Sequence, residues 1–191
     1  SIFPVRSAGI PINIRNTFNP AAKGTMIVAD GKQQGKNGRV VTGIAGRKGF
    51  TIINIEKDMM NSEIGFCRKA LSVLEYEGVS FEHMPSGIDT MSLVISSAAL
   101  EGRRDKLMQS VARAVHPDSV FIEDGLALVA VVGRGMIKAK GTAARVCDAL
   151  ARADVNIRMI DQGSSELSII VGVDDEDFES TIRAIYGEFV K

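Results

Sequence analysis

The sequence contains no tryptophan, and aromatic residues make up only 5% of its 191 residues. Few side chains are therefore available to stack on the bases of single-stranded nucleic acid. The formal net charge is zero, from 23 basic and 23 acidic residues, so no bulk field draws the chain to nucleic acid or a membrane surface. No apolar run approaches the roughly 20 residues of a membrane span, and no signal peptide is visible. We therefore expect a cytoplasmic protein with neither nucleic acid nor a membrane among its partners.

The chain has only two cysteines and two histidines, which restricts its redox and metal chemistry. Cys67 and Cys147 lie far apart in the sequence and lack CxxC spacing, so we expect two buried free thiols. His83 and His116 are isolated, and neither has a second ligand at helical spacing. The sequence thus predicts neither a disulfide nor a metal site.

One block of the sequence occurs twice, at a constant offset of 76 residues. Phe50 to Ser96 aligns with Leu126 to Gly172 without a gap, and the apolar pattern repeats along the block. The identical pairs are Met60/Met136, Gly65/Gly141, Leu74/Leu150, Val79/Val155, Gly87/Gly163 and Ser92/Ser168. Two copies of one small α/β unit form a symmetric scaffold. This favours a regulatory module whose function lies where the copies meet, rather than a catalytic domain.

The first copy predicts the element order βαββαβ. Its expected elements are a strand Phe50–Glu56, a helix from Gly65 that Gly78 ends, strands Val79–Met84 and Thr90–Ser96, a helix Glu101–Val115 and a strand Ser119–Glu123. This order is typical of the ferredoxin-like α+β fold, in which a four-stranded antiparallel sheet carries both helices on one face.

The second copy lacks a fourth strand. Its expected elements are a strand Leu126–Val132, a helix Thr142–Ala153, strands Val155–Asp161 and Leu167–Val173 and a helix Asp177–Phe189. One edge of its sheet would stay open, unless the β-branched run Arg39–Ala45 fills it. We therefore predict that Val40–Ala45 pairs beside Leu126–Val132, so that copy one is inserted in copy two; a lone strand elsewhere is the alternative. The expected domains are residues 1–38, a connector; 49–124, the first unit; and 39–48 plus 125–191, the second unit.

Two stretches carry a resemblance to a known family. One is Asn156–Glu166, preceded by Val132-Gly133-Arg134-Gly135-Met136; the other is Ile10–Pro20, followed by Gly24-Thr25. The former stretch closely resembles the C-terminal regulatory region of aspartate kinases, which is built from two ACT domains. The latter is similar to the stretch that leaves the kinase domain of this family, which implies that residues 1–38 are the tail of a kinase domain and a connector. The resemblance covers nearly the whole chain, and the inserted topology of the family agrees with the strand deficit above.

The resemblance implies a parent enzyme that phosphorylates the β-carboxylate of aspartate with ATP, the first step of lysine, threonine and methionine biosynthesis. Gly31–Gly38 and Gly133–Gly141 fit neither GxxxxGK[ST] nor GxGxxG in a strand–turn–helix context. Val132–Gly135 does follow a strand and precede a helix, but we interpret it as a turn that lets the backbone approach a partner domain. We therefore expect no catalytic residue, cofactor or kinase activity in this fragment, and assign ATP and Mg to the kinase domain of the same chain.

A free amino acid offers a carboxylate and an ammonium group. The carboxylate suits the unpaired N–H groups at a helix N-terminus, which occur after the loops before Gly65 and Gly141. The ammonium needs an acceptor from the facing strand, where Glu82 in copy one corresponds to Arg158 in copy two. Because an acid suits an ammonium and an arginine does not, copy one is the better candidate site.

Resemblance to lysine-sensitive aspartate kinases implies an effector pocket in copy one, which residues near Ser86 to Thr90 close. The implied residues are Met60, Asn61, Ser62, Gly65, Phe66, Ser80, Phe81 and Glu82. The alternative for Met60, Phe66 and Phe81 is an ordinary core, and that for Ser62 and Ser80 is capping or solvation.

We expect lysine as the effector, because nearby acids could pair its second ammonium group. These acids are Glu56, Asp58, Glu63, Glu82 and Asp89. Threonine stays open, since Ser62 or Ser80 could bind its hydroxyl. Two hypotheses follow: the effector-binding region of an allosteric aspartate kinase, which forms a homodimer through its ACT domains, or a freestanding ACT-type binding or dimerisation module without a kinase domain.

Overall fold

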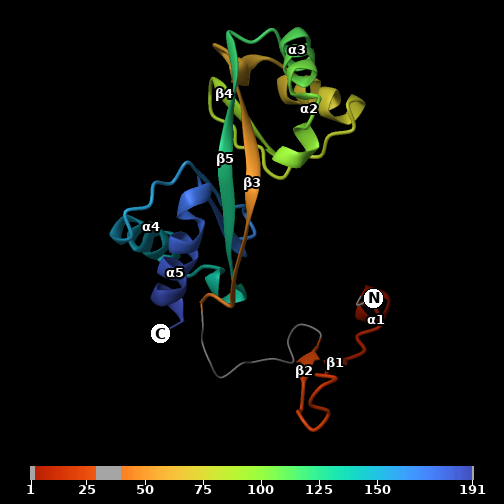
Figure 1. Ribbon diagram of the computed structural model, residues 1–191, viewed down its shortest axis with the longest axis vertical. Helices are drawn as coiled ribbons and strands as arrows, with labels where there is room; N and C mark the ends of the chain where they lie inside the picture. Colours follow the sequence, from red (N-terminus) through yellow and green to blue (C-terminus); the bar gives the residue numbers. More distant parts are fainter. Residues whose placement is uncertain (1–2, 29–39, 191) are drawn as a thin grey trace. The chain divides into compact units, whose positions relative to one another are not determined.

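The computed structural model describes residues 3–28 and 40–190, and the chain divides into two compact units, Ser1–Gly38 and Arg39–Lys191 (Figure 1). The first unit holds a short helix α1, Phe3–Arg6, and an antiparallel pair of strands, β1 (Ile12–Ile14) and β2 (Thr25–Ile27). Its assignment as the tail of a kinase domain stays a prediction. The glycine-rich stretch Gly31–Gly38 lies outside the described residues.

The second unit contains a five-stranded antiparallel sheet with the order β4-β3-β5-β7-β6. The strands are β3 (Gly43–Glu56), β4 (Thr90–Ser96), β5 (Ser119–Val132), β6 (Met159–Asp161) and β7 (Ser168–Asp174). The helices are α2 (Phe66–Tyr76), α3 (Arg104–Val115), α4 (Thr142–Arg152) and α5 (Phe178–Phe189). Strands β3 and β5 have 14 residues each and run through both copies of the repeat.

The predicted exchange of strands between the copies is confirmed. Gly43, Ile44 and Ala45 pair with Val132, Val131 and Ala130, and the N–H of Thr42 donates to the carbonyl of Val132 at 2.8 Å. The run before copy one thus completes the sheet of copy two, and the α+β, ferredoxin-like fold is confirmed. Because β3 and β5 pass from one copy to the other without a break, the residue boundaries drawn between the two units stay a prediction.

The expected edge strand Val79–Met84 is the main difference from the predicted elements. Its region makes only isolated bridges, from His83 to Val94 and from Ser86 to Met91. Pro85 lies between them and has no N–H to donate, which interrupts a regular ladder. The equivalent strand in copy two is likewise shorter than expected, and it begins at Met159.

The two long strands are bulged at equivalent positions. The pairing register shifts between Arg47 and Phe50 and again between Phe50 and Ile52. The shifts coincide with Gly49 (φ 85°) and Gly125 (φ 73°), which are one repeat offset apart and have left-handed backbones that glycine adopts without strain. The predicted strands Ser119–Glu123 and Leu126–Val132 are therefore a single strand with a bulge.

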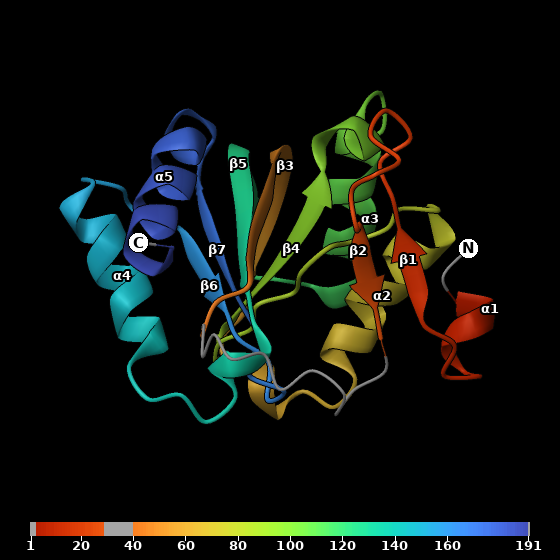
Figure 2. The same ribbon diagram turned by 90° about the horizontal axis from the view of Figure 1, so that it is seen from below.

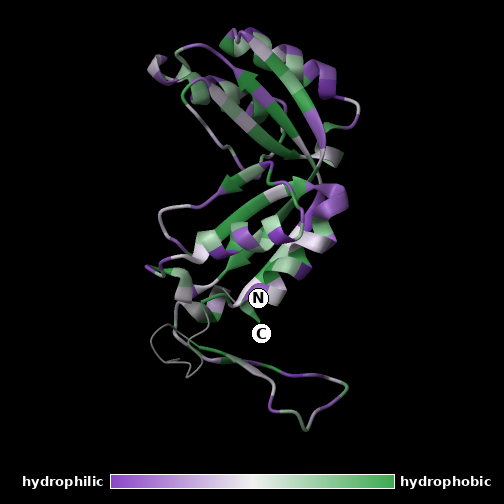
Figure 3. Cartoon of the chain, turned by 90° about the vertical axis from the view of Figure 1, so that its left-hand side faces the viewer, coloured by the Kyte–Doolittle hydropathy of each residue, from purple (hydrophilic) through white to green (hydrophobic). Residues whose placement is uncertain are grey.

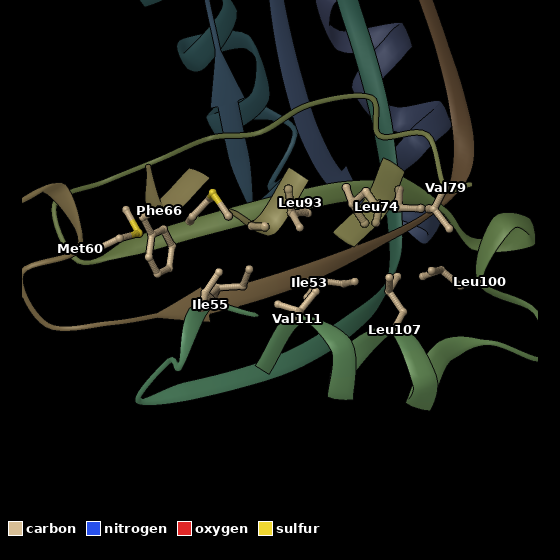
Figure 4. Packing of buried hydrophobic residues seen from close by; sticks show 14 residues of the cluster. Ile53, Ile55, Met60, Phe66, Leu74, Val79, Leu93, Leu100, Leu107 and Val111 are labelled. Atoms are coloured by element: carbon tan, nitrogen blue, oxygen red, sulfur yellow. The ribbon is translucent and has the colours of Figure 1, made fainter. Parts of the chain in front are cut away.

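Three clusters of buried side chains form the core. In copy one, Ile53 and Ile55 of β3 pack against Leu74, Leu107 and Val111 of α2 and α3 (Figure 4). The corresponding cluster of copy two joins the sheet to α4 and α5, and it includes Val129, Val131, Val146, Leu150 and Ile185. The third cluster contains Phe50, Ile52, Val94, Leu126 and Leu128, which alternate with the helix-facing residues and so lie on the helix-free face of the sheet.

The two helix pairs cover different parts of this sheet. In Figure 2, α4 and α5 lie on one side of the strands, and α2 and α3 lie on the other. The strands are largely hydrophobic, whereas the helices carry both hydrophobic and hydrophilic residues (Figure 3). In the part of the chain that the structure describes, no helix is long and apolar enough to cross a membrane.

Gly133 provides a test of the strand exchange. A Cβ atom there would lie 2.2 Å from the carbonyl oxygen of Val40 and 2.9 Å from the Cα of Val41, and both are backbone atoms that cannot rotate away. We expect Gly133→Ala to lower the free energy of unfolding by about 1–3 kcal/mol, as overpacking does. Gly163→Ala is the matched control, because nothing lies within 4 Å of its Cβ, and it should change stability little. Equal chemical denaturation curves for the two variants would contradict this packing.

Candidate functional site

The loop after β3 and the turn before β4 are held together by backbone hydrogen bonds. The N–H of Lys57 donates to the carbonyl of Asp89 at 2.8 Å, and the N–H of Asn61 donates to that of Ile88 at 3.1 Å. The N–H of Met59 donates to the Asp89 side chain at 2.9 Å. The loop that carries Met60 to Phe66 therefore lies beside the turn that was expected to close the pocket.

The predicted site residues of this loop divide into core and surface. Met60 and Phe66 are only 4% and 2% exposed, and both belong to the core of copy one (Figure 4). Asn61 and Ser62 are exposed, and Gly65 precedes α2 with a left-handed backbone. Helix α2 has no side-chain cap at its N-terminus. The exposed polar groups of the loop thus lie close to uncapped N–H groups, which attract a carboxylate.

Ser80, Phe81 and Glu82 are exposed but lie farther along the sheet. The N–H of Glu82 donates to the carbonyl of Val94, whereas Ser86 bridges to Met91 near the loop. Three residues along a strand span about 10 Å. In Figure 4, Val79 and Met60 accordingly lie at opposite ends of the cluster.

The structure therefore does not bring the Ser80–Glu82 segment to the Met60–Phe66 loop within one chain. The Oε1 atom of Glu82 instead accepts a hydrogen bond from Nη2 of Arg47 at 2.8 Å. The assignment of the eight residues to effector binding stays a prediction, because no ligand contact tests it.

A charged cluster that sequence reasoning missed fixes the loop. Glu63 accepts hydrogen bonds from Nζ of Lys57 at 2.5 Å and from Nζ of Lys69 at 2.6 Å, while Lys57 also donates to the carbonyl of Val115 at 2.9 Å. The hydrogen bond from Lys57, and then that from Lys69, lowers the pKa of the Glu63 carboxyl from its ordinary 4.5 to about 2. Lys57 lies six residues before Glu63 and Lys69 lies six residues after it. Helical periodicity does not predict a contact at this separation.

The equivalent acceptor position of copy two is already occupied. Arg158 has a side chain only 16% exposed, and its Nη1 donates to Asp174 at 2.9 Å and to the carbonyl of Asp124 at 3.2 Å. Its Nη2 also lies 3.6 Å from Glu123. Arg158 is therefore less available to a ligand than Glu82 of copy one, which is 47% exposed although it is paired with Arg47.

Neither cysteine forms a disulfide. Cys67 and Cys147 are free and partly exposed, so the expected thiols are present but less buried than predicted. Within residues 3–28 and 40–190, no group of three or more His, Cys, Asp or Glu side chains could hold a metal ion.

Comparisons with known proteins agree with the resemblance seen in the sequence. Residues 129–189 match the family model of the ACT domain. Aspartokinase 3 of Bacillus subtilis (strain 168) is 43% identical over 190 residues, which cover 99% of this chain and 41% of the relative. This chain therefore spans about two fifths of the length of that relative.

Solved structures of aspartate kinases are also similar to this chain. The crystal structure of Clostridium acetobutylicum aspartate kinase has a TM-score of 0.92 and 54% identity, over 98% of this chain and 43% of that chain. E. coli aspartokinase III in complex with lysine and aspartate has a TM-score of 0.76 and 24% identity, over 100% of this chain and 41% of that chain, which bears on the fold alone. The resemblance to the regulatory region of aspartate kinases is confirmed.

The Glu63 cluster predicts an acid-sensitive loop. Because the pKa of Glu63 is lower in the folded protein than in the unfolded chain, its ion pairs stabilise the fold above about pH 4.5, and this contribution disappears as the pH falls toward 2. Glu63→Gln should remove that part of the pH dependence. NMR titration of the Glu63 carboxyl, with melting curves at several pH values, would check this. A midpoint near 4.5 would refute it.

Proposed function

We propose that this chain is the regulatory region of an aspartate kinase, and that it binds an end-product amino acid to mediate feedback inhibition. The observation that carries the proposal is the 43% identity to an aspartokinase across 99% of this chain. That match includes the N-terminal unit, which lies outside the two ACT-like copies and would have no role in a freestanding module. The parent enzyme would transfer phosphate from ATP to aspartate in the cytoplasm, with ATP and Mg bound by its kinase domain.

Outside residues 29–39, the turn at Gly133 is the one candidate for a phosphate-binding loop. The geometry of this turn gives little support for phosphate binding. The N–H of Gly133 donates to the carbonyl of Leu167 at 3.0 Å, so it is not free to bind a phosphate. The backbone of Gly133 also lies against Val40 and Val41. The turn therefore takes part in backbone packing within this chain, and its expected approach to a partner domain stays a prediction. A fragment of this kind should be inactive as a kinase by itself.

The loop end of copy one offers groups for both ends of a free amino acid. The uncapped N-terminus of α2 suits the carboxylate, and Asn61 and Ser62 are exposed beside it. Asp58 and Asp89 come from the loop and its neighbouring turn, and they could pair the second ammonium group of lysine. Glu63 is already paired with two lysines, so it is a weaker candidate than the sequence suggested. Lysine remains favoured, with threonine as the alternative.

Exposed apolar side chains at the same end support a homodimer through copy one. Met59, Ile64 and Ile88 are 70%, 97% and 68% exposed. At the equivalent positions, copy two carries Gly135, Lys140 and Ser164. An apolar group of this kind on one copy, and not on the other, fits a contact between identical surfaces of two chains.

Calorimetric titration with lysine and with threonine tests the effector. We expect lysine to give saturable heat, and Asp58→Asn to weaken its binding about tenfold, because a hydrogen bond to a charged group contributes about 1.5–3 kcal/mol. Asp105→Asn, on the exposed first turn of α3, is the control of equal charge change. Heat from threonine but not from lysine would reverse the choice of effector, and unchanged lysine binding by Glu82→Ala would remove Glu82 from the site.

Light scattering at micromolar concentration tests the assembly. The chain should have the mass of at least a dimer, and Ile64→Lys, which installs the residue of copy two, should shift the mass toward that of a monomer. Ile137→Asn is the reciprocal control, since it gives copy two the residue that copy one has at position 61. A monomeric mass for the unsubstituted chain, or equal masses for all three proteins, would argue against this interface.

A further inference from the structure

Two equivalent ion pairs join the copies, and their charges are exchanged. Arg47 pairs with Glu82 at 2.8 Å, and one repeat offset later Glu123 lies 3.6 Å from Arg158. In the second pair the Arg158 side chain is only 16% exposed and is held by Asp174 as well, although Glu123 itself is 47% exposed. The first pair is open to solvent, since the side chains of Arg47 and Glu82 are 61% and 47% exposed.

A groove of about 280 Å³ lies beside the open pair, on the helix-free face of the sheet. Ala45, Ala130 and Ile170 line it from neighbouring strands of copy two, where Ala130 pairs with both of the others. Arg47, Glu82 and His83 line it from the junction with copy one. The groove thus combines an apolar floor with one cation and one anion in direct contact.

The repeat shows that the fold itself does not require this hollow. The positions equivalent to Ala45 and Ala130 are Phe121 and Asn54, which pair with each other in the sheet of copy one. There a large ring takes the place of a methyl group, and the Asn54 side chain hydrogen-bonds to Glu123 at 2.7 Å. The small residues are therefore particular to the side of the junction that carries the open ion pair.

We propose that this groove is a second amino-acid site, which takes a free α-amino acid with an uncharged aliphatic side chain. The guanidinium of Arg47 binds the carboxylate, the carboxylate of Glu82 binds the ammonium group, and the side chain lies on Ala45, Ala130 and Ile170. An exposed ion pair contributes little to stability, so its opening costs little. A charged side chain is disfavoured on this floor, because a buried charge needs a partner. The volume lies below the usual range of drug-sized pockets and suits a small ligand.

The groove lies apart from the Met60–Phe66 loop, and binding there does not depend on an effector at the loop. Glu82 is anchored at Val94, whereas the loop is anchored at Ile88 and Asp89. A bound amino acid would replace the direct contact between Arg47 and Glu82 with a bridged one. It would leave the neighbouring contact between copies, from Nδ1 of His83 to Oδ2 of Asp161 at 3.0 Å, in place. The ligand therefore acts on the junction between the copies.

NMR of the 191-residue chain with labelled alanine, isoleucine and methionine methyl groups tests the site, with L-isoleucine as the probe. We expect saturable shifts at Ala45, Ala130 and Ile170. N-acetyl-L-isoleucine and L-isoleucinamide, which each lack one charge, should bind about tenfold more weakly or worse. The same loss is expected for Arg47→Gln and for Glu82→Gln, and Ala130→Phe should abolish binding by filling the groove.

Glu123→Gln is the matched control, because it alters the equivalent pair and should leave isoleucine binding unchanged. The Ile185 methyl signal reports whether each variant keeps the fold of copy two. The proposal is overturned if isoleucine gives no saturable shift at the three groove methyl groups, or if both charge variants bind it as the unsubstituted chain does. Shifts confined to Met60 would assign the probe to the loop site and also overturn the groove. Loss of lysine heat alone would count against the proposed effector and leave the groove unaffected.

Discussion

The sheet depends on the pairing of β3 with β5, because each of these strands belongs to both copies. Every strand edge that stays open leaves a row of unpaired backbone groups, and copy two has no strand of its own for one of its edges. The residues before copy one supply the missing strand. Along the chain, a strand of copy two therefore comes first, copy one follows, and the rest of copy two comes last. Both copies therefore share two continuous strands, which a flexible linker between separate domains would not provide.

The shared strands must also present apolar side chains to helices in both copies. Side chains alternate along a strand, and a slip of one residue moves all of them to the other face. In β5, Ile122 packs with the core of copy one, whereas Ala127 and Val129 pack with that of copy two, so the alternation changes from even to odd numbers. The extra residue at each glycine bulge provides this change. Gly49 and Gly125 thus let one strand serve two cores.

The sequence indicated much of this architecture because the repeat offset and the strand count are local information. The alternation of apolar residues located the helices and most strands, and the missing strand of copy two pointed to the run before copy one. Distances along the sheet are not local, which is why Ser80 to Glu82 were grouped with a loop about 10 Å away. Pro85 lies inside the expected turn, and because it has no N–H to donate it also interrupts the neighbouring ladder.

The sequence shows that Arg158 of copy two stands where copy one has Glu82, but it does not show which residues pair with them. Arg47 and Glu123 precede the aligned block, so the comparison of copies did not include them. In the sequence, this difference suggested that one copy binds a ligand and the other does not. In the fold, the two residues belong to two salt bridges across the junction, and the charges of one are reversed in the other. The expectation that function lies where the copies meet gains a physical basis from this arrangement.

The two arginines of these pairs are held differently, which gives them different roles. The Arg158 side chain is only 16% exposed and is held by Glu123, Asp174 and the carbonyl of Asp124, so the Arg158 cluster fixes the junction more firmly than the exposed Arg47 does. An exposed pair is worth about 0–1 kcal/mol, so the Arg47 side can rearrange at low cost. Allosteric coupling between sites is typically about 1–3 kcal/mol. A junction fixed on one side and adjustable on the other can transmit an energy of this size without loss of the fold.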